Sequence, residues 1–280
     1  MKHIPDWQLP AGVDRGLWDY IHHRGLAEQY DQILAGTPLF QLDTLWAERF
    51  FTTPGDLIDL GCGTGRFLHS FAPRGFRCTG VDISEEMLNV AKANADRLGL
   101  PIQWQQANLV DGLTIFADHS FDYAVCLFST LGMVRGESAR QQLLCQVRRI
   151  LRPNGRFLLH VHNYWYYLGQ LVRYLRWSTV AKHLLFQNPS ISPLTRENKG
   201  KHTGEYKERY ASGDFAMQQS YGGEPVTIHH FRRREIINTL NQSGFQIRKI
   251  IPIGIGASET LSFPSILSNL RAYGFLILAE

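Results

Sequence analysis

The chain has 280 residues, of which 44% are hydrophobic and 19% are charged. These are ordinary values for a soluble globular protein, and the length suffices for one complete α/β domain with an insertion. No apolar run reaches the roughly 18–20 residues needed to span a bilayer, and the first residues lack the apolar core of a signal peptide. We therefore expect a cytoplasmic protein that does not act at a membrane.

The cysteines and the net charge narrow the choice of ligands. The four cysteines, at positions 62, 78, 126 and 145, show no Cys-x-x-Cys spacing, which favours reduced thiols over disulfides or a metal site. The net charge of +4 permits an anionic partner but does not require one. We expect no bound metal, and the sequence leaves the oligomeric state open.

Two amphipathic helices are expected near the start of the chain, over residues 13–36 and 38–51. From residue 56 onward, short apolar runs alternate with helical patterns, which predicts a mainly parallel sheet. The expected strands are 56–60, 77–82, 102–107, 121–127 and 156–162. The helices between them are expected at 64–73, 84–98 and 137–151, with a turn at 153–155.

Residues 164–226 interrupt this alternation. The segment opens with aromatic side chains at 164–167, continues as a helical pattern to about residue 187 and then becomes polar and loop-like. Two alternating runs, 204–211 and 215–221, flank Ser212-Gly-Asp214 and predict a hairpin. We interpret this segment as a cap over the active site.

The alternation resumes afterwards. A helix is expected at 231–243, a strand at 245–252 and a closing strand at 273–278. The predicted organisation is thus a core of residues 52–163 and 227–280, a cap of residues 164–226, and N-terminal helices in residues 1–51 that form part of the active-site cover.

The most informative motif lies where the first strand gives way to a helix. Glycines stand at 61, 63 and 65, and Asp82 ends the next apolar run 21 positions after Gly61. Glycines let a ligand touch the backbone, and the following helix offers free N–H groups and the positive end of its dipole to an anionic group. An acidic residue at the next strand end is placed to accept from both ribose hydroxyls. Together these features predict a pocket for an adenosine-bearing cofactor.

The spacing Gly-x-Gly-x-Gly differs from the nicotinamide fingerprint, which would require glycine where Arg66 stands. The segment Asp59-Leu-Gly-Cys-Gly-Thr-Gly65 resembles the first motif of the class I S-adenosylmethionine-dependent methyltransferases. The resemblance covers about residues 55–163 and 227–251. It implies a Rossmann-like methyltransferase fold: an α/β architecture with a seven-stranded, mostly parallel sheet, helices on both faces and an inserted cap.

The resemblance also implies which residues bind S-adenosylmethionine, whose product is S-adenosylhomocysteine. Gly61, Cys62 and Gly63 would line its methionine end, Asp59 would position the loop or the amino group, and Asp82 would accept from the ribose. The remaining contacts would border the adenine and the sulfonium, and are Ile83, Met87, Ala107, Asn108, Leu109, Leu127, Phe128 and Ser129. The family usually has an acidic residue at position 108, and an asparagine carbonyl can make the same bond.

Methyl transfer is an in-line displacement, so orientation of the reactants can supply most of the catalysis, and a base is needed only if the acceptor must lose a proton. The candidate catalytic residues are His162, Tyr164 and His229, with His160 and His230 as their neighbours in sequence. Structural roles for these side chains remain open. No Asn-Pro-Pro-Tyr or Asp-Pro-Pro-Tyr element follows the fourth strand, which argues against methylation of nucleobase amines.

The function that these observations favour is methyl transfer to an oxygen, nitrogen or carbon of a small-molecule acceptor enclosed by the cap. One alternative is a tRNA or rRNA methyltransferase, suggested by Arg232-Arg-Arg234 and by basic residues of the cap. No appended RNA-binding module is visible, so a nucleic-acid partner is disfavoured. Two further alternatives are a catalytically inactive cofactor-binding scaffold and a nicotinamide oxidoreductase. The acceptor and its pathway do not follow from the sequence.

Overall fold

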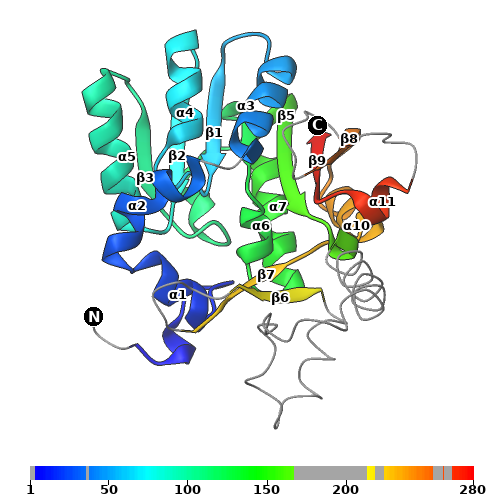
Figure 1. Ribbon diagram of the computed structural model, residues 1–280. Helices are drawn as coiled ribbons and strands as arrows, with labels where there is room; N and C mark the ends of the chain where they lie inside the picture. The colour runs from blue at the N-terminus through cyan, green and yellow to red at the C-terminus, as the bar shows by residue number, and fades with distance from the viewer. Residues whose placement is uncertain (1–3, 36–37, 167–212, 218–223, 255–260, 262–266) are drawn as a thin grey trace, which may run out of the picture.

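The computed structural model describes residues 4–35, 38–166, 213–217, 224–254, 261 and 267–280. Its centre is a seven-stranded sheet of order β3-β2-β1-β4-β5-β9-β8, in which β9 is antiparallel to both neighbours and the other paired strands run parallel. The strands of this sheet are β1 Asp56–Leu60, β2 Arg77–Asp82, β3 Gln103–Gln106, β4 Phe121–Cys126, β5 Leu151–His162, β8 Ile247–Ile253 and β9 Gly274–Ala279. The predicted fold class, a mostly parallel α/β sheet, is confirmed (Figure 1).

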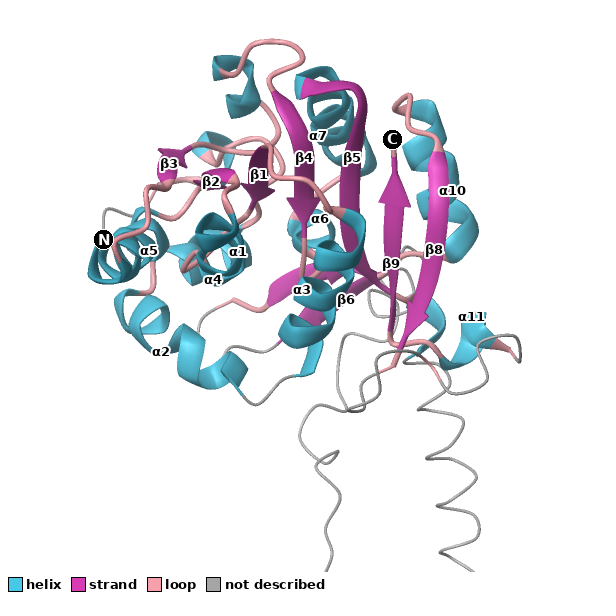
Figure 2. Cartoon of the chain, turned by 90° about the horizontal axis from the view of Figure 1, so that it is seen from above, coloured by secondary structure: helices cyan, strands magenta, loops and turns pink. Residues whose placement is uncertain are grey.

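Helices pack on both faces of the sheet. They are α1 Arg15–Ile21, α2 Arg24–Ala35, α3 Pro38–Phe50, α4 Arg66–Phe71, α5 Glu85–Leu98, α6 Thr130–Met133, α7 Glu137–Ile150, α10 Arg233–Gln242 and α11 Ser268–Arg271. One apolar core joins the strands to α7 and α10, and a second joins them to α3 and α4. Figure 2 shows α7 and α10 on one side of the sheet and α3 on the other. Because β1 is buried on both faces, successive residues such as Leu57 and Ile58 point into different cores.

The strands and helices of the core lie close to where the apolar runs place them. Helix α5 begins after Ser84, whose side chain accepts from the Met87 amide, and ends at Gly99 in the left-handed conformation. Strand β5 differs from its prediction because it already begins at Leu151, which pairs with Phe121. The expected turn at 153–155 is therefore an irregularity inside that strand, with Asn154 at a φ of 64°.

The first expected helix, 13–36, is two helices. Helix α1 ends at Ile21 and α2 begins at Arg24, and the His23 amide donates to the Tyr20 carbonyl at the break. Periodicity did not reveal the break because both helices bury an apolar stripe. Helix α2 packs on α5 through Leu26, Ala27 and Met87.

Residues of the expected cap are described in part. Strand β6 Asp214–Met217 pairs antiparallel with β7 Val226–His229. The sequence predicted a different partner for this run, namely 204–211, which lies outside the described residues, as does the expected helix up to residue 187. Strand β7 packs against α1, because the carbonyl of Pro225 lies where a Cβ on Gly16 would stand. The small sheet therefore contacts both the N-terminal helices and the core.

Tyr164 and Phe215, near the two ends of the segment 167–212, lie side by side. The Tyr164 amide donates to the Phe231 carbonyl, and the Tyr164 ring lies 6.1 Å from that of Phe215. The His230 amide donates to the carbonyl of Gly213. Tyr164 and Gly213 therefore lie near one another although a long stretch of sequence separates them. Within the described ranges, no helix is both long and apolar enough to cross a bilayer.

Candidate active site

The glycine motif forms a tight loop between β1 and α4. Gly61 and Gly65 have φ values of 80° and 78°, which other residues rarely adopt. Space is limiting as well, because a Cβ on Gly61 would lie 2.4 Å from Cγ2 of Thr130 and one on Gly65 would lie 2.4 Å from the Trp104 ring. Both the conformation and the packing therefore require glycine at these two positions.

Backbone hydrogen bonds within the loop fix its shape. The amides of Gly61 and Cys62 both donate to the Val81 carbonyl, at 2.8 and 3.0 Å, and the Gly65 amide donates to the Cys62 carbonyl. The Gly63 amide donates to the Asp82 carboxylate at 2.8 Å. These four N–H groups are therefore engaged within the protein. The loop is consequently rigid before any ligand binds.

Asp82 ends β2 and is held in a defined orientation. Its Oδ2 accepts from Gly63 and its Oδ1 accepts from the Ser84 amide at 2.9 Å. Each carboxylate oxygen has a second lone pair, so both can still accept from a ligand. Burial raises the pKa of Asp82, while the hydrogen bonds from Ser84, Gly63 and Ile83 oppose this shift. This arrangement fits a ligand that offers two adjacent hydroxyl groups.

Two more polar groups lie at the same end of the site. Burial, and secondarily the charge of Asp82, raise the pKa of Asp59 to about 8, so this carboxyl is mostly protonated at neutral pH. Burial also raises the pKa of Cys62, which keeps its thiol neutral. A cationic group brought next to Asp59 would favour its ionised form.

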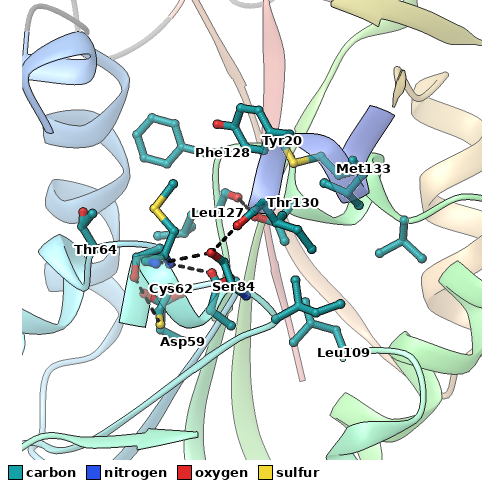
Figure 3. A pocket seen from close by; sticks show the side chains of 18 of the residues that line it. Tyr20, Asp59, Cys62, Thr64, Ser84, Leu109, Leu127, Phe128, Thr130 and Met133 are labelled. Carbon is teal, nitrogen blue, oxygen red and sulfur yellow. Dashed lines mark hydrogen bonds between the residues drawn. The ribbon is translucent and has the colours of Figure 1, made fainter. Parts of the chain in front are cut away.

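These residues line a cavity with about 1120 Å³ of empty space, its open mouth included. Figure 3 shows Asp59, Cys62 and Ser84 at one end, with Tyr20, Phe128 and Met133 at the other. Eleven of the predicted cofactor residues line it, namely Asp59, Gly61, Cys62, Gly63, Asp82, Ile83, Met87, Asn108, Leu109, Leu127 and Phe128. The glycine loop and the following strand ends thus surround one common space.

Two predicted cofactor residues, Ala107 and Ser129, lie outside that lining. The Ala107 amide donates to the Asp82 carbonyl, which joins β3 to β2. Ser129 is fully buried, and its hydroxyl accepts from the His162 amide. Both residues therefore shape the walls of the cavity from behind.

Asn108, expected to accept from an adenine amino group, already has two partners. Its amide donates to the Ala11 carbonyl at 2.9 Å, and its carbonyl accepts from the Val110 amide at 3.1 Å. The carbonyl keeps one lone pair for a ligand. Asn108 thereby also anchors the N-terminal segment, in which Gly12 and Val13 line the cavity.

The segment after β4 has an unusual backbone. Phe128 and Ser129 have φ values of 52° and 60°, and this left-handed conformation is costly for a bulky side chain such as phenylalanine. The Ser129 amide donates to the His160 carbonyl, which holds the turn in place. The turn places the Phe128 ring in the cavity wall.

The candidate His162 lies behind the cavity and does not line it. Its Nε2 lies 3.2 Å from the Tyr273 hydroxyl, and its ring packs against that of His230. Burial lowers the pKa of His162 well below its ordinary value, and the neighbouring His160 and His230 lower it further. His160 itself pairs with Asp43 at 2.8 Å, and both side chains are fully buried. These histidines are neutral or paired groups of the interior.

His229 and Tyr164 also lie outside the cavity lining. Both ring nitrogens of His229 are bonded to carboxylates, Nδ1 to Asp214 at 2.7 Å and Nε2 to Glu235 at 2.6 Å. Burial alone would lower the pKa of His229, but these two bonds outweigh it and the pKa is raised. The Tyr164 ring stacks under the guanidinium of Arg232, 4.0 Å from its carbon. A histidine near a strand end was the only sequence signal for His229, and it did not distinguish a histidine bonded to carboxylates from a catalytic base.

Several lining residues were not singled out from the sequence. Tyr20 and Tyr30 come from the N-terminal helices, Phe40 comes from α3, and Arg66 begins α4. The guanidinium carbon of Arg66 lies 4.7 Å from the centre of the Phe40 ring. The amphipathic pattern of the N-terminal helices predicted that their aromatic residues are buried, but it did not predict that these residues line the cavity. Arg66 had one signal, because it stands where the nicotinamide fingerprint requires glycine. Within the described ranges, no group of three or more His, Cys, Asp and Glu side chains could hold a metal ion.

Comparison with known proteins agrees with this geometry. Residues 57–155 match the family model described as a methyltransferase domain. The chain is 33% identical over 141 residues to YqeM of Bacillus subtilis strain 168, named as a methyltransferase, over 50% of this chain and 56% of that protein. It is 34% identical over 108 residues to the demethylmenaquinone methyltransferase of Tropheryma whipplei strain Twist, over 39% of this chain and 42% of that protein. The chain therefore spans about half the length of these curated relatives.

A solved structure resembles nearly the whole chain. It is the 1,6-didemethyltoxoflavin-N1-methyltransferase of Burkholderia thailandensis, with bound 1,6-didemethyltoxoflavin and S-adenosylhomocysteine. The TM-score is 0.56 at 14% identity, over 99% of this chain and 97% of the other. The chain therefore has the fold of these S-adenosylmethionine-dependent methyltransferases. It contains a methyltransferase domain, which runs from β1 into β5.

Proposed function

We propose that this protein transfers a methyl group from S-adenosylmethionine to a small-molecule acceptor. The observation that carries the proposal is the orientation of Asp82, whose two oxygens are fixed by Gly63 and Ser84 at the edge of the cavity. Each oxygen can accept one ribose hydroxyl. Ile83, Met87 and Leu109 supply apolar surface on which an adenine ring can lie. The donor's contribution to the chemistry is an activated methyl group on a positively charged sulfur.

The acceptor would occupy the end of the cavity that carries Tyr20, Phe128 and Met133. This end is apolar and aromatic, which favours a compact organic molecule over a folded nucleic acid. Relatives named as acting on a quinone precursor and on a toxoflavin precursor support a small acceptor of this kind. We further propose that an oxygen, nitrogen or carbon atom of this acceptor receives the methyl group, and that the cap of residues 164–226 encloses the acceptor.

Orientation supplies the catalysis in this proposal. Among the described residues that line the cavity there is no histidine, and Asp59 and Asp82 lie at the donor end. An acceptor that arrives ionised or already nucleophilic needs no base. Holding it in line with the methyl group contributes on the order of 7–11 kcal/mol to the lowering of the barrier.

Calorimetry with S-adenosylhomocysteine and NADH tests the donor assignment. Wild-type protein is expected to bind the sulfur compound and not the dinucleotide. Asp82→Ala should weaken binding by about 10- to 150-fold, since loss of a charged acceptor for two hydroxyls costs roughly 1.5–3 kcal/mol. Asp96→Ala, which removes an exposed carboxylate on α5, is the matched control and should change nothing. A dissociation constant for Asp82→Ala within twofold of wild type would contradict the assignment.

Turnover tests the acceptor class. Methyl-labelled donor is incubated with a panel of phenols, amines and acidic carbon compounds, and separately with bulk tRNA. Label in the small-molecule fraction is expected. Label confined to tRNA would overturn the small-molecule proposal. If the protein binds the donor but transfers no label to any acceptor or to a cell extract, it would be a catalytically inactive cofactor-binding scaffold.

A further inference from the structure

The amino-acid end of the proposed donor carries a carboxylate as well as an ammonium group, and the glycine loop is poorly placed to hold the carboxylate. The amides of Gly61, Cys62 and Gly65 donate to backbone carbonyls, and the Gly63 amide donates to Asp82. The charge of Asp82 would also repel a further carboxylate. A cationic side chain elsewhere in the cavity would give the ligand carboxylate a partner of opposite charge.

Arg66 is the one lysine, arginine or histidine among the described residues that line the cavity. It is the first residue of α4, directly after the glycine loop. Its guanidinium is bracketed by aromatic rings, with its carbon 4.7 Å from the centre of Phe40 and 5.8 Å from the centres of Tyr30 and Phe128. Stacking on rings holds a guanidinium plane while leaving its edges for hydrogen bonds.

Asp31 on α2 fixes this arrangement from one side. Its Oδ1 lies 3.2 Å from Nε of Arg66 and accepts from the Thr64 hydroxyl at 2.6 Å. This ion pair uses the Nε position, so it does not occupy the edge formed by the two Nη atoms. That edge can bind a carboxylate through two parallel hydrogen bonds.

We propose that Arg66 binds the α-carboxylate of the donor, with Asp31 as its positioning residue. The inference rests on the proposed function. The two charges of the donor's amino-acid end would then have complementary partners, because the ammonium would lie near Asp59 and the carboxylate near Arg66. The glycine loop and α2 adjoin here, since a Cβ on Gly63 would lie 3.7 Å from the Tyr30 ring. Recognition of the amino-acid end thus depends on a residue that the glycine motif does not include.

Two ligands that differ at this end distinguish the proposal from alternatives. S-adenosylhomocysteine carries the amino-acid group, whereas 5′-methylthioadenosine shares its adenosine and sulfur but lacks it. Arg66→Met removes the charge but keeps an apolar stem between the rings. We expect it to weaken S-adenosylhomocysteine binding about tenfold or more, the size of a charged hydrogen bond, with 5′-methylthioadenosine binding within twofold of wild type. Arg66→Lys should restore part of the loss.

The matched control is Arg74→Met. Arg74 also combines an ion pair, to Glu48, with a ring contact, to Phe71, but it does not line the cavity. It should leave both ligands unaffected. If Arg66→Met weakens the binding of both ligands equally, Arg66 only supports the fold. If the binding of both is unchanged, Arg66 does not bind the donor and would instead face an anionic group of the acceptor. Either result overturns the proposal. Failure of wild-type protein to bind S-adenosylhomocysteine would instead reject the proposed function.

Discussion

Asp59, which is buried, and Asp82, which is partly buried, are two carboxyl groups that share one cavity, and their environments give them different roles. Asp82 accepts hydrogen bonds from Gly63 and Ser84, which favour its ionised form against the effect of burial. For Asp59, burial and the charge of Asp82 both raise the pKa, to about 8. The pair therefore presents one fixed acceptor and one group that changes protonation when a cation approaches.

Donor binding should release a proton. Because the pKa of Asp59 is raised to about 8, the carboxyl is mostly protonated at pH 7 in the free protein. An adjacent ammonium group lowers that pKa, and binding at pH 7 then releases on the order of one proton. Calorimetry of S-adenosylhomocysteine binding in two buffers of different ionisation enthalpy measures this number. Asp59→Asn should abolish the release, and identical heats in both buffers for wild type would contradict the prediction.

The tight loop between β1 and α4 could be predicted from its glycines. The structure explains them, because a turn that packs against Thr130 and Trp104 admits only glycine. Partners of single polar groups could not be predicted. The pairing of His229 with Asp214 and Glu235 joins residues whose approach depends on how β6, β7 and α10 pack. A histidine beside a strand end has the same local sequence whether it is a base or a structural group.

At the level of elements, a network of charged side chains around the buried His229 joins the small β6–β7 sheet to the core. Asp214 of β6 pairs with His229 of β7 and with Arg135, which lies two residues beyond the end of α6. Glu235 in the first turn of α10 takes the other side of the His229 ring. Since Met133 and Val134 line the cavity, the network supports the wall at the proposed acceptor end.

His229→Gln should destabilise the protein in a pH-dependent way. The folded pKa of His229 is raised, so its contribution is complete below the ordinary histidine value of about 6.5 and is lost as the pH rises through the folded value. At pH 6 the loss should be about 2–3 kcal/mol, less than for a fully buried pair because Glu235 is partly exposed.

Urea unfolding at pH 6 and pH 9 measures this difference. The gap between wild type and His229→Gln should be smaller at pH 9, and donor binding by the folded variant should persist. His119→Gln, at an exposed histidine, is the control. A gap that grows at pH 9 would contradict the assigned charge of the network.

Element boundaries show where sequence patterns are sufficient. Strands β1 and β2 were predicted at 56–60 and 77–82 and lie there, because short buried runs between polar turns have one interpretation. The break between α1 and α2 and the early start of β5 were not predicted. Both depend on neighbours, namely the packing of α2 on α5 and the pairing of Leu151 with Phe121.

At the scale of the whole molecule, the cavity at the sheet edge is lined by segments from distant parts of the chain. The N-terminal helices supply Tyr20 and Tyr30, and Phe40 of α3 stacks on Arg66. On the other side, Tyr164 and Phe215 mark the point where residues 167–212 leave and re-enter. We propose that the core binds the donor and that the cap of residues 164–226 recognises the acceptor.

Replacement of residues 188–210 by a Gly-Ser segment of the same length tests that separation. The exchange keeps Asp214 and its bonds to His229 and Arg135, so the fold should remain. Binding of S-adenosylhomocysteine is expected within a few-fold of wild type, whereas methyl transfer should be lost. Full turnover by the exchanged protein would place acceptor recognition outside the cap.

The most direct test is a crystal structure of the protein with S-adenosylhomocysteine. We predict the ligand in the cavity between the glycine loop and α5, with both ribose hydroxyls within hydrogen-bond distance of the Asp82 carboxylate and the adenine against Ile83 and Leu109. A cavity that stays empty at saturating ligand, or a ribose bound away from Asp82, would contradict the account.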